Sequence, residues 1–249
     1  MHYVCNHNPR IFTNLISKAL LTILSFVILP PVTVAQEGQR EQDRLQESGK
    51  VMKEILDIPD NIPQALLNRA ECVIVLPSVK KVAVGIGGSF GRGAMTCRTG
   101  ERFDGPWSPP TMMASGRGNI GMLIGGQATD YVILVMNERG ARSMMSNKVK
   151  LGADASIAAG PKGRTASAAT NASMQAEMLS YSRSRGAFVG VSLQGATLRP
   201  DGGANENLYG KKISDKDIVV NGAVPAPPSA TLLLSTLTEH SPKNLSASR

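Results

Sequence analysis

The stretch "VAVGIGGSFGRGAM", residues 82–95, places five glycines in fourteen positions. Gly85 and Gly87 match the start of the dinucleotide-binding pattern G-x-G-x-x-G, but Phe90 stands where the third glycine belongs. A Walker-type Gly-Lys-Ser/Thr sequence is also absent. The stretch instead alternates aliphatic with small residues, which is typical of a strand that another backbone approaches closely or that bends strongly. We therefore expect structural glycines here, not a nucleotide site.

Segments with a period of two surround this stretch, and segments with helical spacing lie at both ends of the chain. Apolar residues at helical spacing, among them Leu45, Met52 and Ile55, predict an amphipathic helix that Pro59 ends. Asn61 is expected to cap a second short helix. We expect a turn near 128–130 between two strands, a hairpin turn near 185–186, short helices at 138–146 and 231–237, and disorder in the last ten residues.

These patterns together predict an α+β fold. Its centre is a mainly antiparallel, strongly curved, glycine-rich β-sheet, sandwich or barrel-like, with N-terminal amphipathic helices and short peripheral helices. We expect four segments: an export signal over 1–35, an amphipathic helical lead-in over 36–61, the main domain over 62–222, and a Pro/Ala/Ser-rich tail over 223–249 with a short helix.

The first 35 residues have the pattern of an export signal. Arg10 and Lys18 precede an uncharged apolar run, Ala19–Leu29, and small residues precede a cut near Ala35. The run has eleven residues, whereas a membrane-spanning helix needs about 20. Cleavage is therefore expected and retention as an anchor is the alternative. An exported protein, periplasmic or associated with the cell envelope, follows from this prediction.

The residues of common catalytic and metal sites are scarce. The histidines are His2, His7 and His240, outside the expected main domain. Their positions argue against a Ser-His-Asp triad, a Cys-His pair and a histidine metal site in the main domain. We therefore predict no enzyme activity, no catalytic residues, no cofactor and no metal, and a histidine-independent hydrolase using Ser or Asp is the least favoured function.

Two cysteines, Cys72 and Cys97, remain after cleavage, because Cys5 lies in the signal. In an oxidising compartment they can form a disulfide. They can also stay as two buried thiols, which behave as small apolar groups. The sequence leaves both possibilities open.

Cationic residues gather at expected turns, and they favour anionic partners. The formal net charge is +8, and it becomes +6 when Arg10 and Lys18 leave with the signal. Aromatic residues make up 4% of the chain, which argues against single-stranded nucleic acid because its readers stack bases on aromatic rings. The cations at turns are Lys80, Lys81, Arg92, Arg98, Arg102, Arg117, Lys162, Arg164, Arg183 and Arg185.

Several ordered blocks between Ile62 and Gly222 resemble the SYLF domain family. They include "IPQALLNRAECVIVLPSVKK", "GGSFGRG", "WSPP", "GNIGMLIGGQATDYVILVMN", "LGADASIAAGPKGR" and "SYSRSRGAFVGVSLQGATLRPD". The resemblance implies lipid binding, because eukaryotic members bind phosphoinositides and some associate with actin, usually beside SH3 or FYVE modules. Bacterial members are stand-alone exported proteins, so we do not transfer the phosphoinositide and actin partners. The resemblance also implies a lipid-contacting amphipathic segment, which corresponds to Leu45–Ile58.

We therefore predict an exported protein that binds anionic lipid or a membrane surface. The alternative is a structural or oligomeric envelope scaffold that binds a protein partner or its own copies, and we expect no nucleic acid. The candidate lipid contacts are Lys50, Lys53, Lys80, Lys81, Lys162, Arg164, Arg183 and Arg185.

Overall fold

A single curled sheet runs through the domain in the computed structural model, which describes residues 33–84, 86–120, 125–146, 148–163, 175–184 and 187–246. In order along the sheet the strands are β5-β9-β3-β2-β1-β4-β7-β6, and β8 pairs with β7. All described pairs are antiparallel except β6 with β7. The strands are β1 Cys72–Val84, β2 Ile86–Cys97, β3 Thr111–Ile120, β4 Gly125–Val135, β5 Val149–Lys150, β6 Ile157–Ala159, β7 Met178–Ser184, β8 Ala187–Gly190 and β9 Thr197–Pro200.

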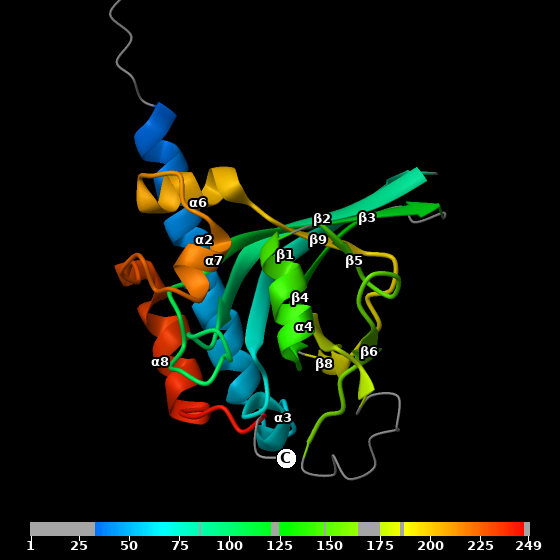
Figure 1. Cartoon of the computed structure of the whole chain (residues 1–249). Coiled ribbons are helices and arrows are strands. Elements are labelled where there is room, and N and C mark those ends of the chain that lie inside the picture. Colours follow the sequence, from blue (N-terminus) through cyan, green and yellow to red (C-terminus); the bar gives the residue numbers. More distant parts are fainter. Residues whose placement is uncertain are drawn as a thin grey trace, which may run out of the picture. The chain divides into compact units, whose positions relative to one another are not determined.

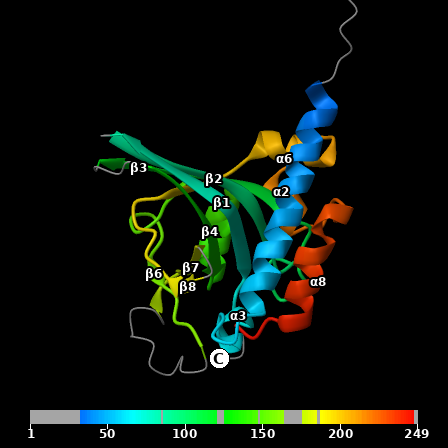
Figure 2. The same ribbon diagram turned by 180° about the vertical axis from the view of Figure 1, so that it is seen from behind.

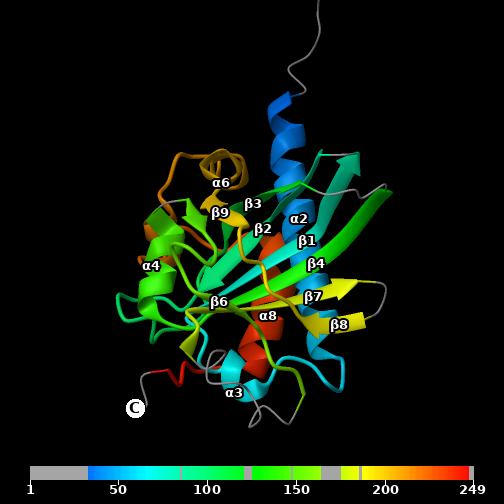
Figure 3. The same ribbon diagram turned by 90° about the vertical axis from the view of Figure 1, so that its right-hand side faces the viewer.

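The two edge strands of the sheet are close in sequence, and this requires the sheet to curl. Strands β5 and β6 stand at opposite ends of the strand order, yet only residues 151–156 separate them along the chain. Six residues span at most about 20 Å, so the two edges must approach each other. The result is an incomplete barrel, seen edge-on in Figure 1 and from the side in Figure 3. The predicted α+β fold with a mainly antiparallel, strongly curved sheet is confirmed.

Helices cover both faces of this sheet. They are α2 Thr33–Leu56, α3 Gln64–Leu67, α4 Glu138–Ser146, α6 Gly202–Tyr209, α7 Asp215–Val219, the 3-10 turn η2 Pro228–Ala230, and α8 Thr231–His240. Figure 2 shows α2 and α8 side by side across one face. Gly49 of α2 permits their close contact, since a Cβ there would lie 2.9 Å from the backbone nitrogen of Leu233.

Alternation along β1 divides the buried residues into two cores. Val73 and Val75 join the helix-side core, to which α2 and α8 contribute Met52 and Leu233. Cys72, Ile74 and Leu76 point the other way and join the inner core with Met144 of α4 and Ile218 of α7. Neighbouring strand residues face opposite sides, so one apolar run fills both cores.

Two glycines of the opening stretch accommodate a bulge in β1. The register between β1 and β2 shifts between Val75 and Lys80, and Ser78 has a φ of 48°. A Cβ on Gly93 would lie 1.9 Å from the carbonyl oxygen of Val75, and one on Gly91 would lie 2.5 Å from Val79 Cγ2. No side chain fits at these distances, which confirms the structural interpretation of these two glycines.

Two local predictions about turns and caps are wrong. Residues 128–130 form part of β4, so the β3–β4 reversal lies between Ile120 and Gly125. The amide of Asn61 donates to the carbonyl of Leu56 at 2.5 Å, and α3 begins at Gln64, so Asn61 terminates α2 and does not cap α3.

Part of the expected disordered end is ordered. Asn244 donates to the carbonyl of Phe103 at 2.7 Å, and the backbone N–H of Leu245 donates to Asn68 at 2.7 Å. Together with α8, residues 241–246 therefore form part of the packed domain.

The chain divides into two units, Met1–Ala35 and Gln36–Arg249. The predicted export signal falls outside the described residues except for Thr33–Ala35, the first residues of α2. Within the described ranges, no helix combines the length and apolar character needed to cross a membrane.

Candidate functional site: a cation-lined cavity inside the curled sheet

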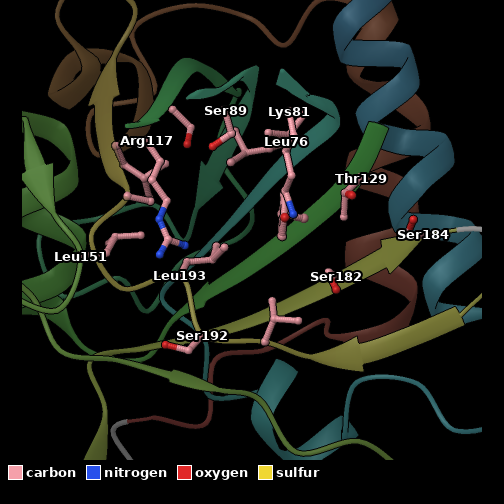
Figure 4. A pocket seen from close by; sticks show the side chains of 16 residues that line it. Leu76, Lys81, Ser89, Arg117, Thr129, Leu151, Ser182, Ser184, Ser192 and Leu193 are labelled. Carbon is pink, nitrogen blue, oxygen red and sulfur yellow. The ribbon is translucent and has the colours of Figure 1, made fainter. Parts of the chain in front are cut away.

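A cavity of about 320 Å³ opens on the inner face of the sheet, between β1, β2, β3, β4 and β7 and the segment 191–198 (Figure 4). This volume lies at the small end of the range typical of ligand pockets, about 300–1,000 Å³. Its apolar wall consists of Leu76, Val79, Leu151, Val191, Leu193, Ala196 and Leu198. Its polar lining consists of Lys81, Arg117, Tyr131, Thr129 and the serines 89, 115, 182, 184 and 192.

Lys81 and Arg117 enter the cavity from two different strands. Ser89 of β2 pairs in register with Lys81 on one side and with Arg117 of β3 on the other. Residues paired across adjacent strands share a face, so both cations lie on one row of the inner face. Figure 4 shows both side chains projecting into the same space. The Lys81 ammonium also lies 5.8 Å from the ring centroid of Tyr131.

The charge of these two cations is not balanced by the residues that line the cavity. Among the described residues that line the cavity there is no aspartate or glutamate. In the described part of the chain, no ion pair involves Lys81 or Arg117. Two like charges that face a confined space without a counter-charge create a positive potential that favours an anion.

Thr129 of β4 adds a polar atom without a partner. Thr129 is buried, and its Oγ1 has no hydrogen-bond partner among the described atoms. A buried hydroxyl without a partner costs about 1–3 kcal/mol, so such groups usually bind water or a ligand. Thr129 pairs in register with Val79, two residues from Lys81. The cavity thus offers hydroxyl and cationic donors together.

The predicted contacts Lys80 and Lys81 separate onto opposite faces of the sheet. Lys81 lines the inner cavity, whereas Lys80 is exposed beside Phe90, Arg92 and the N-terminal half of α2. The two residues are neighbours on one strand, so alternation allows only one of them to face the cavity. The prediction did not choose between them.

Lys50 and Lys53 lie on the exposed side of α2, each paired with a carboxylate. Lys50 Nζ lies 2.6 Å from Glu47, and Lys53 Nζ lies 2.7 Å from Asp57. The hydrogen bond to Glu47 raises the pKa of Lys50 above its usual value. These lysines line none of the walls of the inner cavity.

Arg183 of β7 bridges two acids instead of facing the cavity. Its guanidinium lies 2.9 Å from Asp130 and also contacts Glu54 of α2, so it ties that helix to the sheet. Lys162 is exposed after β6. Arg164 and Arg185 lie outside the described residues. Of the predicted contacts that the structure describes, only Lys81 lines this cavity.

Arg117 and Thr129 were not among the predicted contacts. Arg117 belongs to the wider set of cations at expected turns, but the structure places it within β3. Spacing along the chain does not show that β3 and β1 are both neighbours of β2. That arrangement depends on strand order and register, which bring residues 81 and 117 onto one row.

The amphipathic segment Leu45–Ile58 directs its apolar face into the protein. Leu45, Met52 and Ile55 are fully buried in the helix-side core. The expectation that this face contacts lipid does not fit the structure, because the sheet and α8 already cover it. The expectation came from the family resemblance, and the apolar spacing is the same for a membrane helix and a core helix.

Cys72 and Cys97 form a disulfide, with their sulfur atoms 2.00 Å apart. They are register partners on β1 and β2. Cys72 lies nine residues before Lys81, about 30 Å along an extended strand, so the bond is remote from the cavity row. Across the described ranges, no cluster of three or more His, Cys, Asp or Glu residues could hold a metal ion.

Comparisons with known proteins identify one family and several relatives that this chain matches. Residues 116–240 match the family described as "Ysc84: Las17-binding protein actin regulator". Protein YSC84 of Saccharomyces cerevisiae is 34% identical over 179 residues, covering 71% of this chain and 37% of the yeast protein. LAS seventeen-binding protein 3 of the same species is 31% identical over 179 residues, covering 71% of this chain and 38% of its own length.

The name of a human relative includes a second domain, an SH3 domain. SH3 domain-containing YSC84-like protein 1 of Homo sapiens is 29% identical over 199 residues, covering 77% of this chain and 57% of the human protein. The chain thus spans between about a third and three fifths of the length of these relatives. Because the family match covers half of the chain and its blocks lie on the curled sheet and its helices, the chain belongs to the Ysc84 family, whose shared region is the SYLF domain.

Proposed function

We propose that this SYLF domain is a binding module for an anionic lipid, whose headgroup lies between Lys81 and Arg117. The single observation that carries the proposal is the pair of cations facing one cavity whose described lining residues include no carboxylate. The hydroxyls of Ser89 and Thr129 add donors near the same row. A phosphate or carboxylate head would satisfy both cations and the unpartnered Thr129 oxygen.

The apolar wall suits the chain of such a ligand. Leu76, Val79 and Leu198 lie on the side of the cavity away from the strand ends. Burying an alkyl chain against them contributes about 25 cal/mol per Å² of apolar surface removed from water. Each charge-assisted hydrogen bond adds about 1.5–3 kcal/mol. An amphiphile uses both contributions, whereas inorganic phosphate uses only the second.

A protein partner is the second candidate function. The family description and the name of a yeast relative both refer to binding Las17, and the chain covers only part of that relative. Export to the periplasm or cell envelope, as residues 1–35 predict, belongs to the proposal as well and would place the lipid site at an envelope membrane. A self-associating scaffold would bind copies of the chain and leave the cavity empty.

Calorimetric titration with dodecyl phosphate below its micelle concentration tests the proposal. We expect binding to the full chain, weaker binding of inorganic phosphate, and none of dodecyltrimethylammonium, which shares the chain but reverses the charge. The double variant Lys81→Gln/Arg117→Gln should bind dodecyl phosphate about 10–100-fold more weakly. Raising the salt concentration should also weaken binding, because ions screen exposed charges.

The matched control is Lys50→Gln/Lys53→Gln, which removes the same charge from α2. It should bind like the unmodified chain. Equal loss in both double variants would mean that net charge alone attracts the ligand, and absence of dodecyl phosphate binding would contradict the lipid site. A defined oligomer by light scattering, without ligand binding, would favour the scaffold.

A further inference from the structure

We infer that a groove between α2 and the β1–β2 pair binds an acidic peptide segment of another protein, through an apolar residue that acids flank on both sides. The groove has a volume of about 470 Å³, and residues from 40–47, 77–80 and 90–92 line it. It shares no lining residue with the inner cavity. The inference therefore goes beyond the proposed lipid function and does not depend on it.

One wall of the groove is a stripe of charged side chains on the N-terminal half of α2. Arg40, Arg44 and Glu47 follow one another at spacings of four and three, so they lie on one face of the helix. From Arg40 to Glu47 the helix rises about 10 Å. An extended peptide covers that length with about three residues. The wall thus fits a short acidic–apolar–acidic segment.

The other wall places an aromatic ring between two cations. Lys80 of β1 and Phe90 of β2 are register partners, so their side chains share a face of the sheet. Arg92 lies two residues further along β2, on that same face, and its guanidinium is 5.7 Å from the centroid of the Phe90 ring. An apolar side chain resting on this ring would have a positive charge along the strand and another across it.

The exposed ring of Phe90 supplies the apolar contact. Phe90 is 54% exposed, the highest fraction among the large exposed apolar residues described. Aromatic and arginine side chains are enriched at protein interfaces, where an aromatic ring contributes a large apolar area. Covering the ring with an apolar side chain would remove this area from water.

The charges of the groove favour an acidic partner. Four cations line it, and the carboxylates in its lining are Asp43 and Glu47. Glu47 is already paired with Lys50, whose ammonium lies 2.6 Å away and outside the lining. In the described part of the chain, no ion pair involves Arg40 or Lys80. Acids of a bound peptide would balance these two charges.

Contacts with the rest of the domain hold the walls in place. Arg44 pairs with Glu41 on α2, and Arg92 Nε lies 3.3 Å from Asp201. At the bulge of β1, the backbone N–H of Ser78 donates to Asp130 at 2.9 Å. Walls that are fixed before binding lose little conformational entropy when a peptide is bound.

The shape and charge of the groove favour a peptide over a membrane surface. A helix bounds it on one side and strands on the other, so an extended chain can enter it. A bilayer is flat on this scale, and Asp43 and Glu47 would face its anionic headgroups. Like charges at this wall would oppose docking of an anionic bilayer.

Fluorescence anisotropy with labelled peptides tests the inference. We expect the full chain to bind fluorescein-labelled Glu-Glu-Phe-Glu-Glu. The charge-reversed peptide Lys-Lys-Phe-Lys-Lys should not bind, and Glu-Glu-Gly-Glu-Glu, which lacks the apolar residue, should bind at least about fivefold more weakly. Equal binding of the phenylalanine and glycine peptides, or no binding of either, would overturn the inference.

Variants locate the binding on the protein. Phe90→Ser and Arg40→Gln/Lys80→Gln should each weaken binding of the phenylalanine peptide at least about tenfold. The matched controls are Val189→Ser, at a 43% exposed apolar position on β8, and Lys148→Gln/Lys150→Gln, which removes two exposed lysines at β5. Both controls should bind like the unmodified chain, and an equal loss in variants and controls would contradict the groove.

Two further measurements on Phe90→Ser separate the alternatives. Its binding of dodecyl phosphate should stay unchanged, because Phe90 does not line the inner cavity. Its co-sedimentation with vesicles of 70% phosphatidylcholine and 30% phosphatidylglycerol should also stay unchanged. Loss of vesicle binding together with undiminished peptide binding would show that this surface contacts a membrane, and the peptide site would be wrong. If dodecyl phosphate fails to bind the unmodified chain, the proposed function fails while the peptide site stands.

Discussion

The Arg98 guanidinium lies 3.9 Å from the centroid of the Trp107 ring, and both side chains donate to the carbonyl of Ser241. All of Arg98 is buried, and burial lowers its pKa to about 10, so it stays charged at neutral pH. Ser241 follows α8, so this contact joins the chain's C-terminal segment to the β2 end. A buried charge held by stacking and carbonyl oxygens makes Arg98 a point on which the packing of α8 depends.

Arg98→Ala should destabilise the domain by about 2–4 kcal/mol, because it removes the stacking and the donors to Ser241. Arg98→Lys should retain only part of the stability that Arg98→Ala loses, because an ammonium cannot stack on the ring as a guanidinium does. Thermal denaturation should show a loss of about 5–15 °C for the alanine variant. The exposed Arg102→Ala is the control and should melt within about 2 °C of the unmodified chain. Similar melting of both variants would contradict this role of Arg98.

Gly93→Ala should destabilise the domain by about 3 kcal/mol or more, since its Cβ would lie 1.9 Å from the Val75 carbonyl oxygen. Gly118→Ala on β3 is the matched control, because no atom lies within 4 Å of the Cβ it would add. That substitution should be neutral or slightly stabilising. Urea unfolding of the two variants measures the difference, and equal free energies of unfolding would show that β1 and β2 do not approach as described.

Reducing the Cys72–Cys97 bond should lower the free energy of unfolding by about 3–4 kcal/mol. The bond joins residues with a sequence separation of 25. Reducing it releases a constraint on the unfolded chain, whose conformational entropy then rises. Peptides containing Cys72 and Cys97 should resist alkylation under denaturing conditions until a reductant is added. Full alkylation without reductant would show that both residues are thiols.

Glu71 should make the domain less stable as pH rises. Burial raises the pKa of Glu71 above its ordinary value of 4.5, although Asn244 donates to its carboxylate at 2.5 Å. The ionised form is disfavoured in the folded chain, so its contribution favours folding below pH 4.5 and is lost as pH rises through the folded pKa. Urea unfolding from pH 4.5 to 7.5 should show a smaller decline for Glu71→Gln than for the unmodified chain.

The exposed Glu206→Gln is the comparison for this pH series and should decline like the unmodified chain. Parallel curves for all three proteins would mean that Glu71 does not carry the pH dependence.

Local sequence predicted much of the fold because its signals are short in range. The spacing of Leu45, Met52 and Ile55 predicts α2, and the run from 138 to 146 coincides with α4. Close approach explains Gly91 and Gly93. The β3–β4 turn is misplaced because the small and polar residues of Gly125–Asp130 have the composition of a turn, whereas they lie within β4.

The site was harder to predict because it depends on contacts that are distant in sequence. Lys80 and Lys81 form one basic pair in sequence, and only strand order shows which of them faces inward. Arg117 joins Lys81 through the register of β2 with both of its neighbours. The apolar face of α2 has the pattern of either a membrane contact or a core contact, and the position of α8 decides in favour of the core.

A crystal structure of the domain with dodecyl phosphate tests the central claim most directly. We expect the phosphate within hydrogen-bond distance of Lys81 Nζ and the Arg117 guanidinium, with the alkyl chain against Leu76 and Leu198. Phosphate density at another surface, with the inner cavity holding only water, would contradict the lipid site proposed here.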